Sequence, residues 1–167
     1  MTILVAYATK HGSTREVAEA IADALVERGH HVDLSPAHAL KDVDSFEGVV
    51  LGGALYTGRW HRDARGFLKQ HRRSLTERPV AVFGLGPRTL AASEVAGSRA
   101  QLDKALAAVP EVRPVAVAIF GGVVDPTELR FPFNRMPASD ARDWDAIEAW
   151  AALVAERLAE ATVPITP

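Results

Sequence analysis

The sequence contains no cysteine, which excludes disulfide frameworks, thiolate zinc sites, iron–sulfur clusters and cysteine nucleophiles. Long apolar runs are also missing, because none approaches the ~18–20 residues that a membrane-spanning helix requires. The first apolar run, 3–8, is too short for a secretory signal and lacks its basic flank, so we expect a cytoplasmic protein. Neither sign of charge dominates, since 19 Lys and Arg stand against 21 Asp and Glu. The overall charge therefore gives no reason to expect a nucleic-acid partner.

The composition is that of a globular protein, with 48% hydrophobic and 24% charged residues in a chain of 167. This length corresponds to about one domain. No internal repeat and no Gly/Ser-rich or Pro-rich linker divides the chain. We therefore expect one domain over residues 1–161, followed by a frayed tail over 162–167.

Short apolar runs alternate with longer segments of helical periodicity along the chain. The sequence predicts strands over 2–8, 31–34, 48–54, 79–85 and 113–120, and helices over 13–29, 62–75, 94–109 and 143–161. Ser13 lies three residues before Glu16, a spacing that predicts a capping box at the start of the first helix. Five strands separated by helices indicate an α/β fold, a three-layer sandwich with a five-stranded parallel sheet of order 2-1-3-4-5. The stretch 121–142 is longer than a routine connection.

The segment that follows the first strand has the properties of an anion site. Residues 9–14 read TKHGST, and ligands of such folds bind beyond the carboxyl ends of the strands. Gly12 permits a tight turn, while the amides of Ser13 and Thr14 lie at a helix start, where free N–H groups and the helix dipole attract an anion. The alternative is that Ser13 is only a helix cap and Gly12 only a turn residue.

Other ligand and metal motifs are absent from the sequence. Residues 9–14 lack the second glycine and the Gly-Lys-Ser/Thr ending of a Walker loop. The only G-x-G, at Gly84 and Gly86, follows the fourth strand and is broken by Pro87, so it is no dinucleotide fingerprint. The six histidines lack metal-ligand spacing, so no metal site is predicted.

Two motifs resemble a known family. Thr9-x-x-Gly12-x-Thr14 after a first strand resembles the phosphate loop of flavodoxins, which bind FMN. Residues 53–61, which read GALYTGRWH, and the following Phe67 resemble a narrower group, the flavodoxin-domain proteins similar to menaquinone-dependent protoporphyrinogen dehydrogenase. The resemblance runs from residue 2 to about 120 and resumes in the last helix. At position 11 a histidine replaces the threonine that is commonest in simple flavodoxins.

This resemblance implies that the three-layer sandwich is flavodoxin-like and that FMN is the cofactor, and it suggests which residues hold the FMN. The FMN phosphate would be held by Thr9, His11, Gly12, Ser13 and Thr14. The isoalloxazine ring would lie between Leu55, Tyr56, Thr57, Gly58, Arg59 and Trp60 on one side and Gly84, Leu85, Gly86 and Pro87 on the other. Tyr56 and Trp60 are the candidate stacking aromatics, and the alternative for each is packing of the loop on the next helix.

Positive charge is concentrated near the expected ring loop. Residues 59–78 contain seven Arg or Lys and two Asp or Glu, a local excess of five positive charges, although part of it is explained equally well by a solvated helix face. We expect Arg59 and Arg62 at the mouth of the pocket, where they would contact an anionic or quinone-like substrate or a redox partner protein.

The segment from Leu129 to Met136, which reads LRFPFNRM, is both apolar and basic. In the resembled dehydrogenases the corresponding insertion is longer and is associated with membrane and quinone contact. Peripheral membrane contact through this segment is therefore one expectation, and apolar side chains that pin a long loop onto the core are the alternative.

Together these features predict an FMN-dependent oxidoreductase, with protoporphyrinogen dehydrogenase-like chemistry as the specific hypothesis. Two alternatives stay open: a one-electron carrier of the flavodoxin type, and a cofactor-free flavodoxin fold that acts as an interaction protein. A nucleic-acid role ranks last, because the basic helix has no aromatic stacking platform beside it. The sequence does not predict the oligomeric state.

Overall fold

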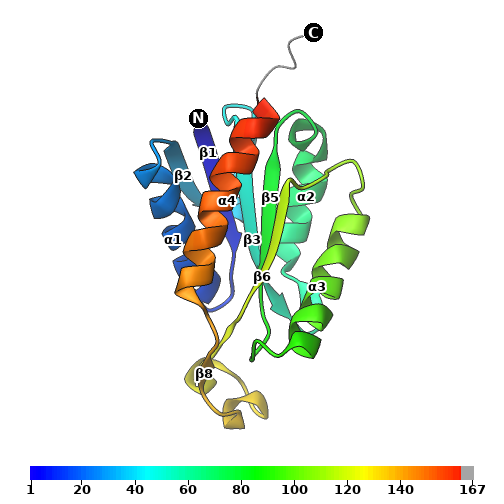
Figure 1. Cartoon of the computed structure of the whole chain (residues 1–167). Helices are drawn as coiled ribbons and strands as arrows, with labels where there is room; N and C mark the ends of the chain where they lie inside the picture. Colours follow the sequence, from blue (N-terminus) through cyan, green and yellow to red (C-terminus); the bar gives the residue numbers. More distant parts are fainter. Residues whose placement is uncertain (163–167) are drawn as a thin grey trace.

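A five-stranded parallel sheet forms the centre of the molecule, in a computed structural model that describes residues 1–162 (Figure 1). Its strands are β1 (Thr2–Ala8), β2 (His31–Pro36), β3 (Gly48–Tyr56), β5 (Val80–Leu85) and β6 (Ala116–Phe120). They lie in the order β2-β1-β3-β5-β6, which confirms the predicted order 2-1-3-4-5. A two-residue strand, β4 (Arg59–Trp60), pairs antiparallel with the end of β3 and was not predicted.

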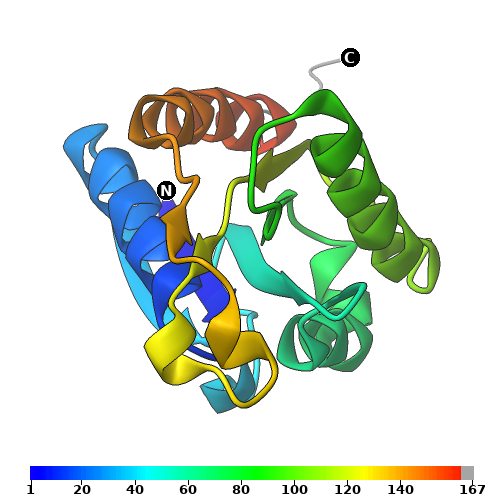
Figure 2. The same ribbon diagram turned by 90° about the horizontal axis from the view of Figure 1, so that it is seen from below.

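Helices cover both faces of the sheet, as Figures 1 and 2 show. One face carries α1 (Ser13–Glu27) and α4 (Trp144–Thr162), and the other carries α2 (Arg62–Leu75) and α3 (Ala92–Ala107). The strands are apolar almost throughout because both of their faces are buried. Under α1 and α4 the core contains an aromatic cluster of Phe83, Phe120 and Trp150, with ring centroids 5.7–5.8 Å apart.

The start of α1 differs from the predicted capping box. Ser13 is already the first helical residue, and the preceding Gly12 has a left-handed φ of 89° with no side chain capping the helix. The Gly12 N–H instead donates to Thr9 Oγ1 at 2.9 Å, so the threonine fixes the shape of the turn. The other end of α1 agrees with the prediction of Gly29 as a C-terminal signal, because Gly29 has φ 87° and follows the last turn.

Residues between β6 and α4 form a small substructure that the sequence did not predict. We call residues 121–142 the insertion. It contains the antiparallel pair β7 (Val123–Val124) and β8 (Ser139–Asp140) and two short 3₁₀ turns, η2 (Pro126–Glu128) and η3 (Phe133–Arg135). Strands of two residues are too short to leave a recognisable alternation. The insertion projects beyond the carboxyl ends of the parallel strands (Figure 1).

The ends of several elements shift from their predicted positions by one to three residues. The predicted frayed tail begins at 162, but Thr162 is the last residue of α4, and residues 163–167 lie outside the described part of the chain. No helix within residues 1–162 combines the length and the apolar composition needed to cross a membrane.

Candidate functional site

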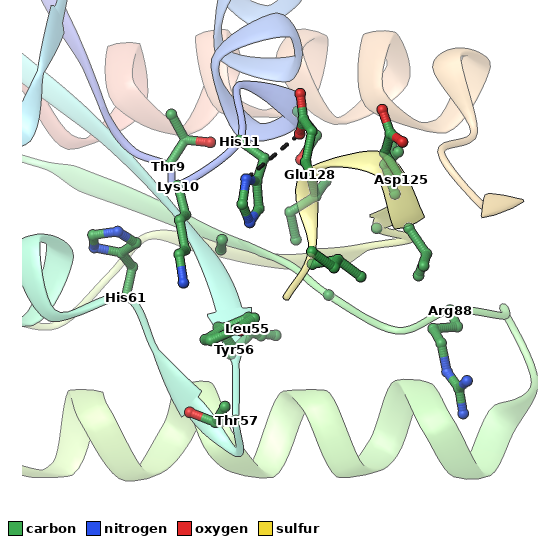
Figure 3. A pocket seen from close by; sticks show the side chains of 18 of the residues that line it. Thr9, Lys10, His11, Leu55, Tyr56, Thr57, His61, Arg88, Asp125 and Glu128 are labelled. Atoms are coloured by element: carbon green, nitrogen blue, oxygen red, sulfur yellow. Dashed lines mark ion pairs between the residues drawn. The ribbon is translucent and has the colours of Figure 1, made fainter. Parts of the chain in front are cut away.

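A cavity of about 770 Å³ lies at the carboxyl ends of the parallel strands (Figure 3). Three predicted segments meet there: the loop after β1, the β3–β4 region and the loop after β5. The insertion forms a further wall. Predicted site residues that line the cavity are Thr9, His11, Ser13, Leu55, Tyr56, Thr57, Arg59, Trp60, Arg62, Leu85 and Gly86. Five others, Gly12, Thr14, Gly58, Gly84 and Pro87, belong to the same loops without lining it.

The loop 9–14 presents donors that have no partner within the described residues. Thr14 is fully buried, and its Oγ1 has no hydrogen-bond partner there. The first amides of α1 have no acceptor in the helix, as in any helix start. The first backbone hydrogen bond closing this turn runs from Glu16 N–H to Gly12 O at 3.2 Å. A ligand with several anionic oxygens, such as a phosphate monoester, would satisfy these donors, so the loop fits the phosphate of FMN.

The first of the two loops that are predicted to enclose the flavin ring, residues 55–60, is a tight β-hairpin. Thr57 and Gly58, the two residues between β3 and β4, have φ values of 50° and 79°. Positive φ at both central residues is characteristic of a type I′ turn, the commonest two-residue hairpin connection. The hairpin was not predicted, because Thr-Gly is a weaker hairpin signal than Asn-Gly or Asp-Gly.

The two aromatic candidates of this hairpin have different environments. Tyr56 is 41% exposed, and the Lys10 ammonium lies 4.7 Å from the centroid of its ring. Trp60 is 1% exposed, and its indole N–H donates to Gly53 O at 3.0 Å. A side chain on Gly53 would collide with that indole. Trp60 is therefore a buried residue in the wall of the cavity, which favours the stated alternative, packing of the loop, over stacking on a ligand.

The second loop that is predicted to enclose the flavin ring, residues 84–87, is held in place by backbone hydrogen bonds. The Gly86 N–H donates to Phe120 O at 3.1 Å, and the Gly122 N–H of the insertion donates to Pro87 O at 2.8 Å. Leu55 packs against Gly86, where a Cβ would lie 2.5 Å from the leucine Cβ. The glycine at 86 is therefore required for the close approach of the two ring-facing loops.

Positive charge gathers at the mouth of the cavity. Arg59, Arg62, Arg65 and Arg88 all line it, and Arg65 and Arg88 were not predicted as site residues. Not all of the basic stretch contributes, because Arg78 is nearly buried and donates to the carbonyls of the β2–β3 connection and of α2. The prediction of a basic mouth at Arg59 and Arg62 is thus compatible with their positions, while Arg78 has a structural role.

His61, another residue that the sequence analysis missed, lines the cavity next to the start of α2. Its Nδ1 accepts a hydrogen bond from Asp63 N–H at 3.0 Å, which makes His61 the N-cap of α2. Burial lowers the pKa of His61, and the nearby Arg62 and Arg65 lower it further, whereas Asp63 opposes the shift. A histidine before an arginine-rich helix gave no recognisable sign of this role.

The insertion is fastened to the loop 9–14 by charged contacts. His11 Nδ1 lies 3.5 Å from Glu128 Oε2, the contact dashed in Figure 3. Arg142 pairs with both carboxylate oxygens of Asp140, at 3.0 and 2.8 Å, and with Glu16 of α1 at 3.0 Å. Arg142 holds the pKa of the Asp140 carboxyl below its usual range. The His11–Glu128 and Arg142–Glu16 pairs link residues more than a hundred positions apart, so sequence patterns did not predict them.

The segment from Leu129 to Met136 exposes its aromatic side chains. Phe131 is 70% exposed and Phe133 51%, and the Arg135 guanidinium lies 5.1 Å from the Phe131 ring centroid. Leu129 and Met136 are partly buried against the cavity. Phe131 and Phe133 therefore do not pin the loop onto the core, whereas the partly buried Leu129 and Met136 agree in part with the predicted alternative of apolar pinning. Within residues 1–162 no three His, Asp or Glu side chains come together as a metal site.

Comparisons with known proteins agree with this fold. The protoporphyrinogen IX dehydrogenase (quinone) of Escherichia coli strain K12 is 29% identical over 87 residues, which is 51% of this chain and 48% of that protein. The chain thus matches about half the length of this relative. Among solved structures, a short-chain flavodoxin associated with a bacterial microcompartment has a TM-score of 0.65 at 17% identity, with 98% of this chain and 99% of that one covered. Oxidised flavodoxin 1 from Bacillus cereus has a TM-score of 0.62 at 15% identity, with coverage of 98% and 100%.

A family model described as a flavodoxin domain matches residues 4–136. The match includes the loop 9–14, both ring-facing loops and most of the insertion. Flavodoxin domains are FMN-binding redox modules, and the unpartnered donors of the loop 9–14 agree with a phosphate ligand. The chain belongs to the flavodoxin-domain family.

Proposed function

We propose that this chain is an FMN-dependent oxidoreductase with protoporphyrinogen dehydrogenase-like activity and a quinone-like electron acceptor. FMN, when bound, supplies the transfer of electrons between substrate and acceptor. The work of the protein is then to bind and orient: the chain contributes the phosphate site, the ring-facing loops and the substrate entrance.

The proposed roles follow from the positions of the residues. Thr9, His11, Gly12, Ser13 and Thr14 hold the phosphate, with Thr14 Oγ1 and the first amides of α1 as donors. The hairpin with Tyr56 at its edge and the loop at Gly86 enclose the ring from two sides. The insertion covers the phosphate end through the His11–Glu128 and Arg142–Glu16 contacts.

One observation carries the enzymatic part of the proposal: the cavity continues from the phosphate loop to a mouth that is both basic and apolar. Arg59 and Arg62 stand on one side, and Leu129, Phe133 and Met136 of the insertion on the other. An anionic substrate with a large apolar ring system, such as a porphyrinogen, matches this combination. The 29% identity to the E. coli dehydrogenase supports the same hypothesis.

The test is an absorbance spectrum of the purified protein, followed by anaerobic incubation with protoporphyrinogen IX and a menaquinone analogue. The proposal expects bound FMN and formation of protoporphyrin IX, which requires the quinone. Bound FMN without turnover, but with electron delivery to an acceptor protein in single-electron steps, would favour the carrier alternative. A protein that stays colourless with excess FMN would instead favour the cofactor-free interaction protein.

We further propose a cytoplasmic location with contact to the membrane surface through the segment from Leu129 to Met136. Its support is the exposure of Phe131 and Phe133 beside Arg130 and Arg135. Sedimentation with vesicles of phosphatidylglycerol, compared with neutral phosphatidylcholine, tests this contact. The double variant F131S/F133S should bind less than the wild-type protein to whichever of these vesicles the wild-type protein binds.

A further inference from the structure

The wall of the cavity near the start of α2 contains two side chains whose hydrogen-bond donors are oriented by the backbone. The first is His61, whose own N–H donates to Ala54 O at 2.8 Å and whose Nδ1 accepts from Asp63 N–H. An imidazole nitrogen that accepts a hydrogen bond carries no proton. The proton of neutral His61 is therefore on Nε2, and this nitrogen is a hydrogen-bond donor.

The second is Arg65, one turn further along α2. Its Nε donates to Trp60 O at 2.9 Å, and Trp60 is anchored in the core through Gly53 O. No carboxylate within residues 1–162 lies at ion-pair distance from Arg65, so its two terminal nitrogens are not engaged in an ion pair there. A guanidinium that is held at Nε keeps a defined plane, which suits it to receive a carboxylate through two parallel hydrogen bonds.

Neighbouring arginines are less well placed. The Arg62 side chain is 87% exposed, and its one ion pair, with Asp63, is 3.9 Å long. The Asp63 carboxylate lies 3.9 Å from Arg62 Nε and 3.7 Å from His38 Nδ1, and it is not at ion-pair distance from Arg65. In this wall of the cavity, Arg65 is therefore the arginine whose guanidinium has a fixed orientation. Arg62 contributes an exposed charge.

We propose that Arg65 and His61 form a carboxylate-binding subsite that orients the substrate of the proposed oxidoreductase. The substrate class is a carboxylate on a short chain attached to a flat apolar body. The carboxylate meets the terminal nitrogens of Arg65 and Nε2–H of His61, and the body lies toward Tyr56 and Phe133 on the same cavity. The inference rests on the proposed function and names positioning residues, not groups that take part in electron transfer.

The experiment titrates the protein as purified with 3-phenylpropionate and with its neutral analogue 3-phenylpropionamide. The His61 imidazole signals in NMR and equilibrium dialysis report binding, and neither requires turnover. We expect the carboxylate to shift the His61 signals and Arg65→Gln to weaken its binding about tenfold or more, with the amide unaffected. Arg65→Lys should restore part of the affinity, because it keeps the charge and loses the fork.

Arg72→Gln is the matched control, since Arg72 is exposed on the same helix and does not line the cavity. Equal losses in Arg65→Gln and Arg72→Gln would overturn the subsite in favour of a general charge effect. Loss of FMN affinity in Arg65→Gln with unchanged riboflavin affinity would overturn it too, because Arg65 would then serve the phosphate. Absence of FMN or of porphyrinogen turnover refutes the proposed function and leaves these titrations unaltered, so the two failures are distinguishable.

Discussion

The ammonium group of Lys10 lies 4.7 Å from the centroid of the Tyr56 ring, so the loop after β1 and the hairpin after β3 meet across the cavity. This cation–π contact covers one face of the ring and is worth ~0.5–1 kcal/mol at an exposed site. The tyrosine is thereby held at the edge of the cavity, and its other face remains the one that a planar ligand would use.

Replacing Tyr56 by leucine tests this arrangement. Loss of the aromatic face should weaken FMN and riboflavin binding to the same degree, by about 0.5–1.5 kcal/mol or roughly threefold to tenfold. Stability should change little, because the side chain is 41% exposed. Fluorescence titration of the flavin-free protein with both flavins measures the effect. An unchanged affinity for both would mean that Tyr56 does not stack on the ring.

The variant Trp60→Phe should lose stability and keep its flavin affinity, the opposite of what we expect for the leucine variant at Tyr56. Trp60 is buried, and its loss leaves a gap and deprives Gly53 O of the indole donor. We expect the free energy of unfolding to fall by about 1–3 kcal/mol, with flavin affinity of the folded protein retained. Urea unfolding followed by circular dichroism gives the first quantity. A stable variant with weakened flavin binding would restore Trp60 as a stacking residue.

The substitution Thr14→Val distinguishes the contribution of the phosphate contact to flavin binding from that of the ring contacts. Valine keeps the shape of the buried threonine and removes the Oγ1 that has no partner in the described structure. FMN affinity should fall about tenfold, since a hydrogen bond to a charged group contributes ~1.5–3 kcal/mol. Riboflavin, which has no phosphate, should bind as before. Equal losses for the two flavins would place the effect on the helix and not on the phosphate contact.

The features best predicted from the sequence are those that depend on residues close together in the chain. Helical periodicity over residues 13–29 predicted α1, and Val17, Ile21 and Leu25 on its inner face are fully buried. Strand order followed from the alternation of strands and helices, because crossover rules leave few topologies. The motif TKHGST predicted a tight turn and a helix start, and both are present, although the helix cap was predicted wrongly: Gly12 occupies the position that Ser13 was expected to fill.

Features that depend on tertiary contacts were missed. Trp60 was expected at a ligand because it stands in a loop motif, but the two-residue strand β4 turns it inward toward Gly53. The Arg142–Glu16 pair joins residues 126 positions apart, and no local pattern indicates it. The donor orientations at Arg65 and His61 also arise from backbone groups of neighbouring residues, which only the folded chain places beside them.

A change at the basic mouth should alter the reduction potential of bound FMN. Arg59 is exposed and lines the cavity, and a positive charge there favours the reduced, more negative flavin. Arg59→Gln should therefore lower the two-electron midpoint potential by about 10–20 mV, the equivalent of ~0.5–1 kcal/mol for a screened charge. Raising the salt concentration should shrink the difference. Arg72→Gln, remote from the cavity, is the control, and a lowering of equal size there would show a net-charge effect.

The pair of Asp140 and Arg142 should make stability depend on pH. Arg142 lowers the pKa of Asp140 in the folded protein, so the folded state favours the ionised carboxylate. The contribution is present above the unfolded pKa of about 3.9 and is lost as the pH falls through the lower, folded value. Asp140→Asn should thus reduce the free energy of unfolding at pH 7 by about 0.5–1 kcal/mol, a figure discounted because the Asp140 side chain is 48% exposed.

The difference between wild type and Asp140→Asn should shrink as the pH is lowered below about 4, because unfolded wild-type protein then binds a proton at Asp140 that the folded protein takes up only at lower pH. Urea unfolding at a series of pH values measures it. Asp103→Asn is the comparison, since Asp103 pairs with Arg99 on the surface of α3, far from the insertion in the sequence. Because Asp140 and Arg142 fasten the insertion to α1, Asp140→Asn should also speed proteolysis between β6 and α4 at pH 7, whereas Asp103→Asn should not. Equal proteolysis of the two variants would show that the pair stabilises the insertion no more than a surface ion pair does.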